Sequence, residues 1–220
     1  MVRNMDQQLE SLDRRLIALG RCCCDIIERA ALTLHDQDDT KIQKVFELDG
    51  KIDHQAMELQ QYCMYLMLMR NPVAGDLRSV TAAMHMAQDM ERIGDQAADL
   101  TQIVRFVDVQ AFTGATDILR MAAKTTDMVR LAMDSYLYGD AAKAQSVIQT
   151  DDEVDALFTR VRQELIDLIA RDAKQAASCM DFLMIAKYFE RIGDHAQNIA
   201  DWVLYVLQGE LPARNDTREK

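Results

Sequence analysis

Apolar residues along much of this chain recur at alternating steps of three and four positions, the spacing of a helix that buries one face. The pattern is clearest near the carboxyl end, where it includes Phe182, Ile185, Phe189, Ile192, Ala196, Ile199 and Val203. An earlier stretch repeats it with Ala83, Met86, Met90, Ile93, Ala97, Leu100 and Val104. Both stretches predict long helices that pack along their neighbours at a shallow angle.

Breaks in this pattern divide the chain into six predicted helices. Asp39 and Thr40 stand where an N-cap belongs, Pro72 ends the helix before it, and Gly139 with Asp140 gives a C′ glycine followed by a cap. The predicted helices cover residues 5–36, 39–70, 76–108, 116–138, 140–172 and 178–208. The short connections make neighbouring helices antiparallel, so the sequence predicts an all-α fold.

The chain also contains a repeat. The sequence ERIGD at residues 91–95 recurs at residues 190–194, and further upstream Asp49 and Asp53 match Asp151 and Asp155. The offset changes from 102 to 99 between these regions, which indicates a length change in a loop. A unit repeated at half the chain length predicts two antiparallel three-helix bundles in tandem, at 1–110 and 111–212. A charged tail is predicted at 213–220, and the junction between the halves near 109–116.

The charge balance narrows the classes of partner. The net charge of −11 argues against nonspecific nucleic-acid binding and against docking onto anionic lipid. No apolar run approaches the length of a membrane-spanning helix, so no direct membrane insertion is expected. The start of the chain lacks the pattern of a secretory signal.

Five cysteines without such a signal predict free thiols in a reducing cytoplasm. Cys22, Cys23 and Cys24 are consecutive, so on a helix they point in three directions and do not easily close on one metal ion. Burial as small apolar groups is the expected role, and the sequence assigns the triplet no further one.

Rows of acidic residues accompany the repeat. The third helix has carboxylates at steps of four, which places them on one face. Antiparallel packing makes Asp53 of the second helix face residue 93 and Asp49 face residue 97. In the second half, Asp155 is expected to face residue 195 and Asp151 residue 199. The predicted ligands are Asp49, Asp53, Glu91, Asp95, Asp99, Asp151, Asp155, Glu190, Asp194 and Asn198.

Carboxylates gathered at one level repel each other unless they are protonated, paired with Arg92 or Arg191, or bound to a cation. An oxygen-only ligand set suits Mg²⁺, Mn²⁺, Ca²⁺ or oxygen-ligated iron. Zinc is disfavoured, because no Cys or His lies at zinc-finger spacing. Asn198 keeps one oxygen ligand and drops a charge, so the second site is expected to be weaker or to select another ion. The simpler alternative is a solvated acidic face.

At these residues the chain resembles the PhoU family of phosphate-transport accessory proteins. The resemblance is strongest in AKYFERIGDHAQNIADWV at 186–203, DMERIGDQAADL at 89–100 and NPVAGDLR at 71–78. It implies a fold of two similar three-helix bundles. It also implies metal clusters held by Glu/Asp-x-x-x-Asp motifs, here Asp49/Asp53, Glu91/Asp95, Asp151/Asp155 and Glu190/Asp194, with Asp99 and Asn198 extending two of them.

The resemblance further implies a cytoplasmic regulator, often a homodimer. Such a protein contacts the ATPase subunit of the phosphate transporter and the membrane sensor histidine kinase of the phosphate regulon. It restrains phosphate uptake and signalling when phosphate is plentiful. The leading hypothesis is therefore a non-enzymatic, metal-binding adaptor. The alternatives are a metal-dependent phosphohydrolase that uses two close ions, and a plain helical scaffold whose acidic residues are only solvated.

Overall fold

The computed structural model describes residues 2–70, 72–107 and 115–211. Within these ranges the chain forms six α-helices and one short 3₁₀ turn, so the predicted all-α fold is confirmed. The elements are α1 (Val2–Thr33), α2 (Asp39–Arg70), α3 (Gly75–Val104), α4 (Ala115–Tyr138), α5 (Ala141–Arg171), η2 (Ala173–Gln175) and α6 (Ala176–Gln208). The predicted junction up to residue 114 and the predicted tail at 213–220 lie outside the described residues.

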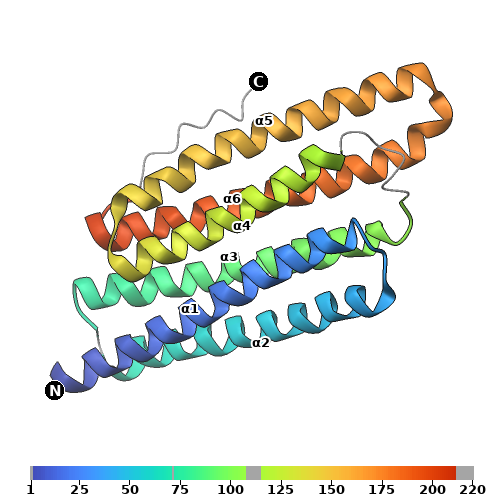
Figure 1. Ribbon diagram of the computed structural model, residues 1–220. Helices are drawn as coiled ribbons and strands as arrows, with labels where there is room; N and C mark the ends of the chain where they lie inside the picture. Colours follow the sequence, from blue (N-terminus) through green and yellow to red (C-terminus); the bar gives the residue numbers. More distant parts are fainter. Residues whose placement is uncertain (1, 71, 108–114, 212–220) are drawn as a thin grey trace.

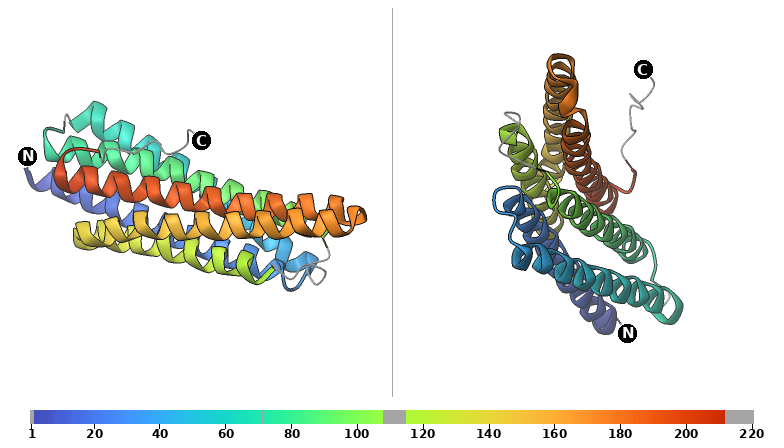
Figure 2. Two further views of the ribbon diagram at one scale, coloured as in Figure 1. Left: turned by 90° about the horizontal axis from the view of Figure 1, so that it is seen from above. Right: turned by 90° about the vertical axis from the view of Figure 1, so that its right-hand side faces the viewer.

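The helices form two three-helix units that pack side by side (Figure 1). α1, α2 and α3 make the first unit, and α4, α5 and α6 make the second. The units meet where α3 packs on α6 and α1 packs on α4. α2 and α5 lie at the outer edges of the array, and the view along the helices shows these edges well apart (Figure 2). Each outer helix thus has one face covered by its own unit.

The predicted apolar seams form the interior. All seven seam residues of α3 and all seven of α6 are buried, none more than 2% exposed. α1 adds Leu12, Leu16 and Leu19, each fully buried. Burial of a large apolar side chain contributes roughly 1.5–3 kcal/mol, so these seams hold the helices of the repeat in register.

Helix ends follow the capping signals with two differences. Asp140 caps α5 by accepting hydrogen bonds from the backbone N–H groups of Ala142 and Lys143, as predicted. Asp38 rather than Asp39 caps α2, because its carboxylate accepts a hydrogen bond from the Thr40 N–H at 2.7 Å. α3 ends at Val104, short of the predicted residue 108, where the Gln37 side chain donates to the Val104 carbonyl.

The three consecutive cysteines point to three different helices, as the sequence predicts. The Cys22 thiol donates to Gln55 on α2, Cys23 to the Met90 carbonyl on α3, and Cys24 to the Thr126 carbonyl on α4. All five cysteines of the chain are free thiols. Nowhere in the described ranges does a helix combine the length and the apolar character needed to cross a bilayer.

Candidate metal centre

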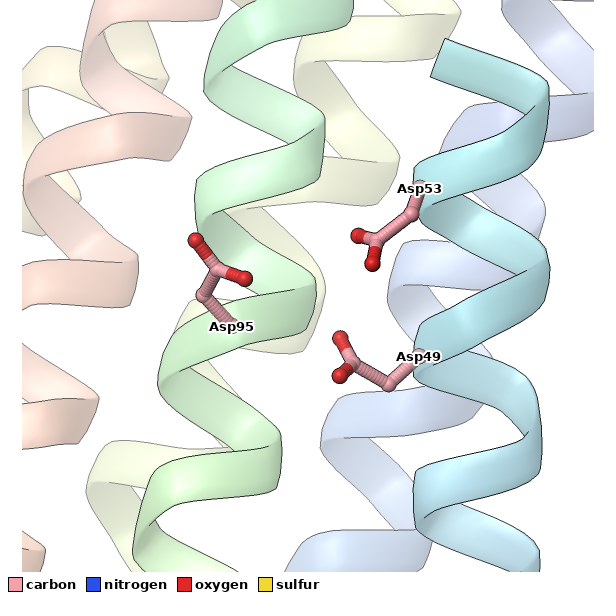
Figure 3. Close-up of side chains that lie close together, drawn as sticks. All are labelled: Asp49, Asp53 and Asp95. Carbon is pink, nitrogen blue, oxygen red and sulfur yellow. The ribbon is translucent and has the colours of Figure 1, made fainter. Parts of the chain in front are cut away.

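Three carboxylates meet between α2 and α3. Asp49 and Asp53 project from α2 toward α3, where Asp95 lies at the same level (Figure 3). One oxygen from each of the three carboxylates lies within 4.8 Å of the other two. Oxygens bound to one hard ion by bonds of about 2.0–2.6 Å are separated by about 3–5 Å. This first cluster therefore has the spacing that one such ion requires.

The electrostatics of the first cluster oppose ionisation of Asp49. Burial, and then the charges of Asp53, Asp95 and Asp99, raise the pKa of Asp49 from 3.8 to about 6. Burial and the charge of Asp95 also raise the pKa of Asp53. The Oδ1 atom of Asp49 is buried without a hydrogen-bond partner among the described residues. A buried, unpaired carboxylate oxygen is costly, and a cation would satisfy it.

A cationic side chain compensates part of this charge. Arg92 is one of the two arginines that the sequence offers as partners for the carboxylates, and it pairs with Asp95 at 3.2 Å. The Arg92 side chain is 52% exposed. A pair so open to solvent contributes little. Arg191, the other candidate, lies with its guanidinium 5.9 Å from the centre of the Tyr188 ring.

Gly94 lets the two helices approach at this level. A Cβ atom at Gly94 would lie 2.9 Å from Oδ1 of Asp49 and 3.1 Å from Cγ2 of Ile52, so Asp49 lies against residue 94 rather than the predicted residue 97. Any side chain at this position would push Asp49 or α2 away. A mid-helix glycine costs about 1 kcal/mol relative to alanine, and the close contact accounts for its presence.

The second half repeats the glycine contact at Asp151, but among the described residues only Asp49, Asp53 and Asp95 bring three carboxylates within 4.8 Å of one another. A Cβ atom at Gly193 would lie 3.0 Å from Oδ1 of Asp151, the counterpart of the Gly94 contact. Burial, and then the charges of Asp155, Asp194 and Glu190, raise the pKa of Asp151 to about 7. These four acidic residues are the second cluster. Asp151 is 8% exposed, so the carboxylate is less accessible to water than most acidic side chains.

The second cluster has a positive charge that the first lacks at the matching position. Lys187 pairs with Glu190 at 2.5 Å on α6. The position 99 residues earlier is Gln88, an uncharged residue one turn before Glu91. The second cluster is therefore partly neutralised by its own helix.

The predicted register of the second half is wrong by more than one helical turn. The sequence predicts residue 199 opposite Asp151, but Asp151 lies against Gly193. α6 begins at Ala176, two residues before the predicted start, which accounts for only part of this shift of six residues. The facing residues of α6 therefore move toward its amino end.

The structure places Asp99 and Asn198 at the contact between α3 and α6. Asn198 donates its amide N–H to Asp89 at 2.9 Å, and Tyr188 donates its hydroxyl to Asp99. These two bonds correspond to each other under the 99-residue offset, since Asp89 matches Tyr188 and Asp99 matches Asn198. The hydrogen bond to Asp89 accounts for an asparagine at position 198 without a role as a metal ligand.

Sequence reasoning does not find Asp89, Tyr188 or the role of His195. Nδ1 of His195 lies 2.9 Å from Oδ1 of Asp89. His85 stacks on Trp202 in the same helix pair, with ring centres 4.2 Å apart. The repeat contains a signal for this contact. Under the 99-residue offset, the pair Asp89 and Asn198 corresponds to the pair Tyr188 and Asp99.

The remaining predicted residues lie near the clusters. Glu91 is half-buried on α3, one turn before Asp95. His54, beside Asp53, is exposed, and its Nε2 lies 3.5 Å from the Glu58 carboxylate.

The fold and these clusters define a class of protein: a tandem repeat of three-helix units, each with an acidic cluster facing a helical glycine. Two copies of the family model described as the PhoU domain match residues 16–104 and 118–203. The chain belongs to the PhoU family.

Named relatives agree with this assignment. A "phosphate-specific transport system accessory protein PhoU homolog" from Clostridium acetobutylicum is 28% identical over 96% of this chain and 97% of that protein. One of the same description from Xylella fastidiosa is 32% identical over 97% of this chain and 90% of that protein. The crystal structure of PhoU from Pseudomonas aeruginosa superposes with a TM-score of 0.88 at 28% identity, covering 93% of this chain and 99% of that one. PhoU from Streptococcus pneumoniae, at 23% identity and a TM-score of 0.88, shares the fold.

Proposed function

We propose that this protein is a non-catalytic regulator of phosphate uptake whose two acidic clusters hold hard metal ions. Asp49, Asp53 and Asp95 would hold one ion, and Asp151, Asp155, Glu190 and Asp194 would hold the other. Mg²⁺, Mn²⁺ and iron suit these oxygen ligands better than Zn²⁺ does. The observation that carries the proposal is the buried, unpaired Oδ1 of Asp49 within 4.8 Å of two further carboxylates.

A bound cation supplies positive charge that makes ionisation of these buried carboxylates favourable. The residues of the chain set the geometry of the clusters. Gly94 and Gly193 hold α2 against α3 and α5 against α6, so each cluster spans two helices of its unit. Metal occupancy would then fix the distance between α2 and α3 and between α5 and α6. A partner protein would contact the outer surface of α2 or α5.

We further propose that the protein acts as an adaptor that restrains uptake and phosphate-regulon signalling in the cytoplasm. Its partners would be the ATPase subunit of the phosphate transporter and the membrane sensor histidine kinase. The names of the relatives, which describe accessory proteins of phosphate-specific transport, support this role. A homodimer belongs to the same proposal.

Two cavities lie away from the acidic clusters. One cavity of about 180 Å³ is lined by residues such as Leu34, Ile118 and Phe182, and one of about 300 Å³ by residues such as Cys24 and Met133. Neither of these two cavities includes a residue of the acidic clusters.

Replacement of Asp95 and Asp194 by alanine tests the proposal. We expect the double variant to lose bound metal, measured by elemental analysis, and to lose repression of phosphate uptake in cells that lack the wild-type protein. Glu58→Ala removes an exposed acid from α2 and is the matched control, expected to keep both properties. Unchanged metal content and unchanged repression in the double variant would refute both halves of the proposal.

A further inference from the structure

Lys187 contacts both helices that carry the second cluster. Its ammonium nitrogen lies 2.5 Å from Oε2 of Glu190, which follows it by three residues on α6. The same nitrogen lies 5.3 Å from the centre of the Phe158 ring, inside the roughly 6 Å of a cation–π contact. Phe158 is on α5, three residues after Asp155 of the cluster. The ammonium is thus held at the edge of the cluster by a residue of each helix.

The ammonium of Lys187 supplies the positive charge that Glu190 needs. The Glu190 side chain is 14% exposed, and its Oε2 atom is buried, with Lys187 as its ionic partner. A buried carboxylate without a partner is costly, so this pair balances the charge in the absence of metal. An ion that takes Oε2 as a ligand must displace the ammonium. An ion bound through the other oxygen of Glu190 would lie close to the ammonium and be repelled by it.

The repeat shows that the fold does not require this lysine. The residue that matches Lys187 in the first unit is Gln88, and the residue that matches Phe158 is Ala56, which is fully buried. The first unit therefore lacks both the charge and the aromatic ring beside it. There Oδ1 of Asp49 is buried without a hydrogen-bond partner among the described residues, and three carboxylates lie within 4.8 Å of one another. The first cluster is thus arranged for an added cation, whereas the second already contacts one.

We propose that Lys187 is a tethered cation that competes with a metal ion for Glu190, so that the second cluster binds metal more weakly than the first. The inference rests on the proposed function, because it concerns the ions that the two clusters would hold. In metal-free protein the ammonium balances the charge of Glu190. Metal binding has to release the ammonium, and the free energy of this release lowers the affinity. As the metal concentration rises, the first cluster therefore fills before the second.

Isothermal titration of the full chain with Mn²⁺ measures this competition. Asp95→Ala removes a ligand of the first cluster, so that binding at the second cluster is observed. In this background we expect Lys187→Gln to bind Mn²⁺ at least tenfold more tightly, because a positive charge beside the ion is lost. Lys143→Gln is the matched control. Lys143 lies over another aromatic ring, that of Tyr138 at 5.1 Å, on the part of α5 before the cluster, and its loss should leave the affinity unchanged.

Thermal unfolding distinguishes competition from a purely structural role of Lys187. In EDTA we expect Lys187→Gln to unfold a few degrees below wild type, because Glu190 loses its ionic partner. At saturating Mn²⁺ the variant should unfold at or above the temperature of wild type, because an ion that binds more tightly stabilises the folded state more. A lysine that only supports the packing of α5 on α6 would change the unfolding temperature equally in both conditions.

Failure of the competition and failure of metal binding give different results. Mn²⁺ binding at the second cluster with an affinity that Lys187→Gln leaves unchanged would overturn the competition and leave the proposed metal sites intact. Absence of Mn²⁺ binding in wild type and in Lys187→Gln would overturn the proposed metal sites and the competition together.

Discussion

Two glycines determine how closely the acidic side chains lie to the neighbouring helix. The space beside Gly94 is occupied by Asp49 and Ile52, and that beside Gly193 by Asp151. The missing Cβ atoms therefore contribute to the clusters as directly as the carboxylates do. The same glycines place carboxylate oxygens in partly buried surroundings, which raises their pKa values.

Gly94→Ala is expected to weaken metal binding at the first cluster at least tenfold, because the methyl group displaces Asp49. The substitution gains about 1 kcal/mol in helix propensity. The close contact between the new Cβ atom and Asp49 should offset this gain in the free energy of unfolding. Gly50→Ala, one residue from Asp49 but with open space around its Cβ, should gain stability and keep its affinity. Isothermal titration with Mn²⁺ and thermal unfolding measure the two effects. Equal affinities in the two variants would contradict the role given to Gly94.

The raised pKa values of Asp49 and Asp151 predict how stability depends on pH in metal-free protein. Each carboxyl has a pKa near 3.8 in the unfolded chain but about 6 and about 7 in the folded one. The folded state thus binds more protons between these values, and the free energy of unfolding falls as pH rises. For Asp151, the loss between pH 5 and pH 8 is on the order of 2–3 kcal/mol.

Urea unfolding in EDTA at the two pH values measures this loss, and Asp151→Asn should reduce it. Saturating Mg²⁺ should reverse the trend, because the ion binds the ionised carboxylates of the folded state. Stability that rises from pH 5 to pH 8 in metal-free protein would contradict the assignment.

The packing of α3 on α6 joins the two units through polar side chains that are related by the repeat. Asp89 accepts from Asn198 and contacts His195, while Tyr188 donates to Asp99. Asp99 also adds to the charge that raises the pKa of Asp49. Asp99 therefore lies next to both the first cluster and the contact between the two units.

Asp89→Ala is expected to cost roughly 1–3 kcal/mol of unfolding free energy, because it leaves donors on α6 without their acceptor. A double-mutant cycle with Asn198→Ala should give a coupling of at least about 0.5 kcal/mol, the range for residues in direct contact. Tyr188→Phe is the milder comparison, with one hydrogen bond lost and about 1 kcal/mol expected. Additive effects of the Asp89 and Asn198 substitutions would argue against the bond.

Helix positions follow from local patterns, which is why the sequence predicts them well. The spacing of Phe189 and Ile192 specifies a buried face, and Asp140 specifies a helix start. The partnership of Asp89 with Asn198 is different, because the two residues lie 109 positions apart and each resembles an ordinary surface residue. The register between α5 and α6 likewise depends on residues far apart in the sequence, such as Asp151 and Gly193.

The whole molecule consists of two units that are similar in fold but differ in their acidic clusters. The first cluster has three carboxylates in close reach, whereas the second has the more buried aspartate and the Lys187 charge. The repeat thus built one scaffold twice, and substitutions within it give the two acidic clusters different charge and burial.

Anomalous scattering from Mn²⁺-soaked crystals shows whether the two clusters bind metal. We expect one peak within about 2.0–2.6 Å of oxygens from Asp49, Asp53 and Asp95, and a second among Asp151, Asp155, Glu190 and Asp194. Wild-type crystals at saturating Mn²⁺ with no peak at either cluster, and with the carboxylates turned into solvent, would contradict it.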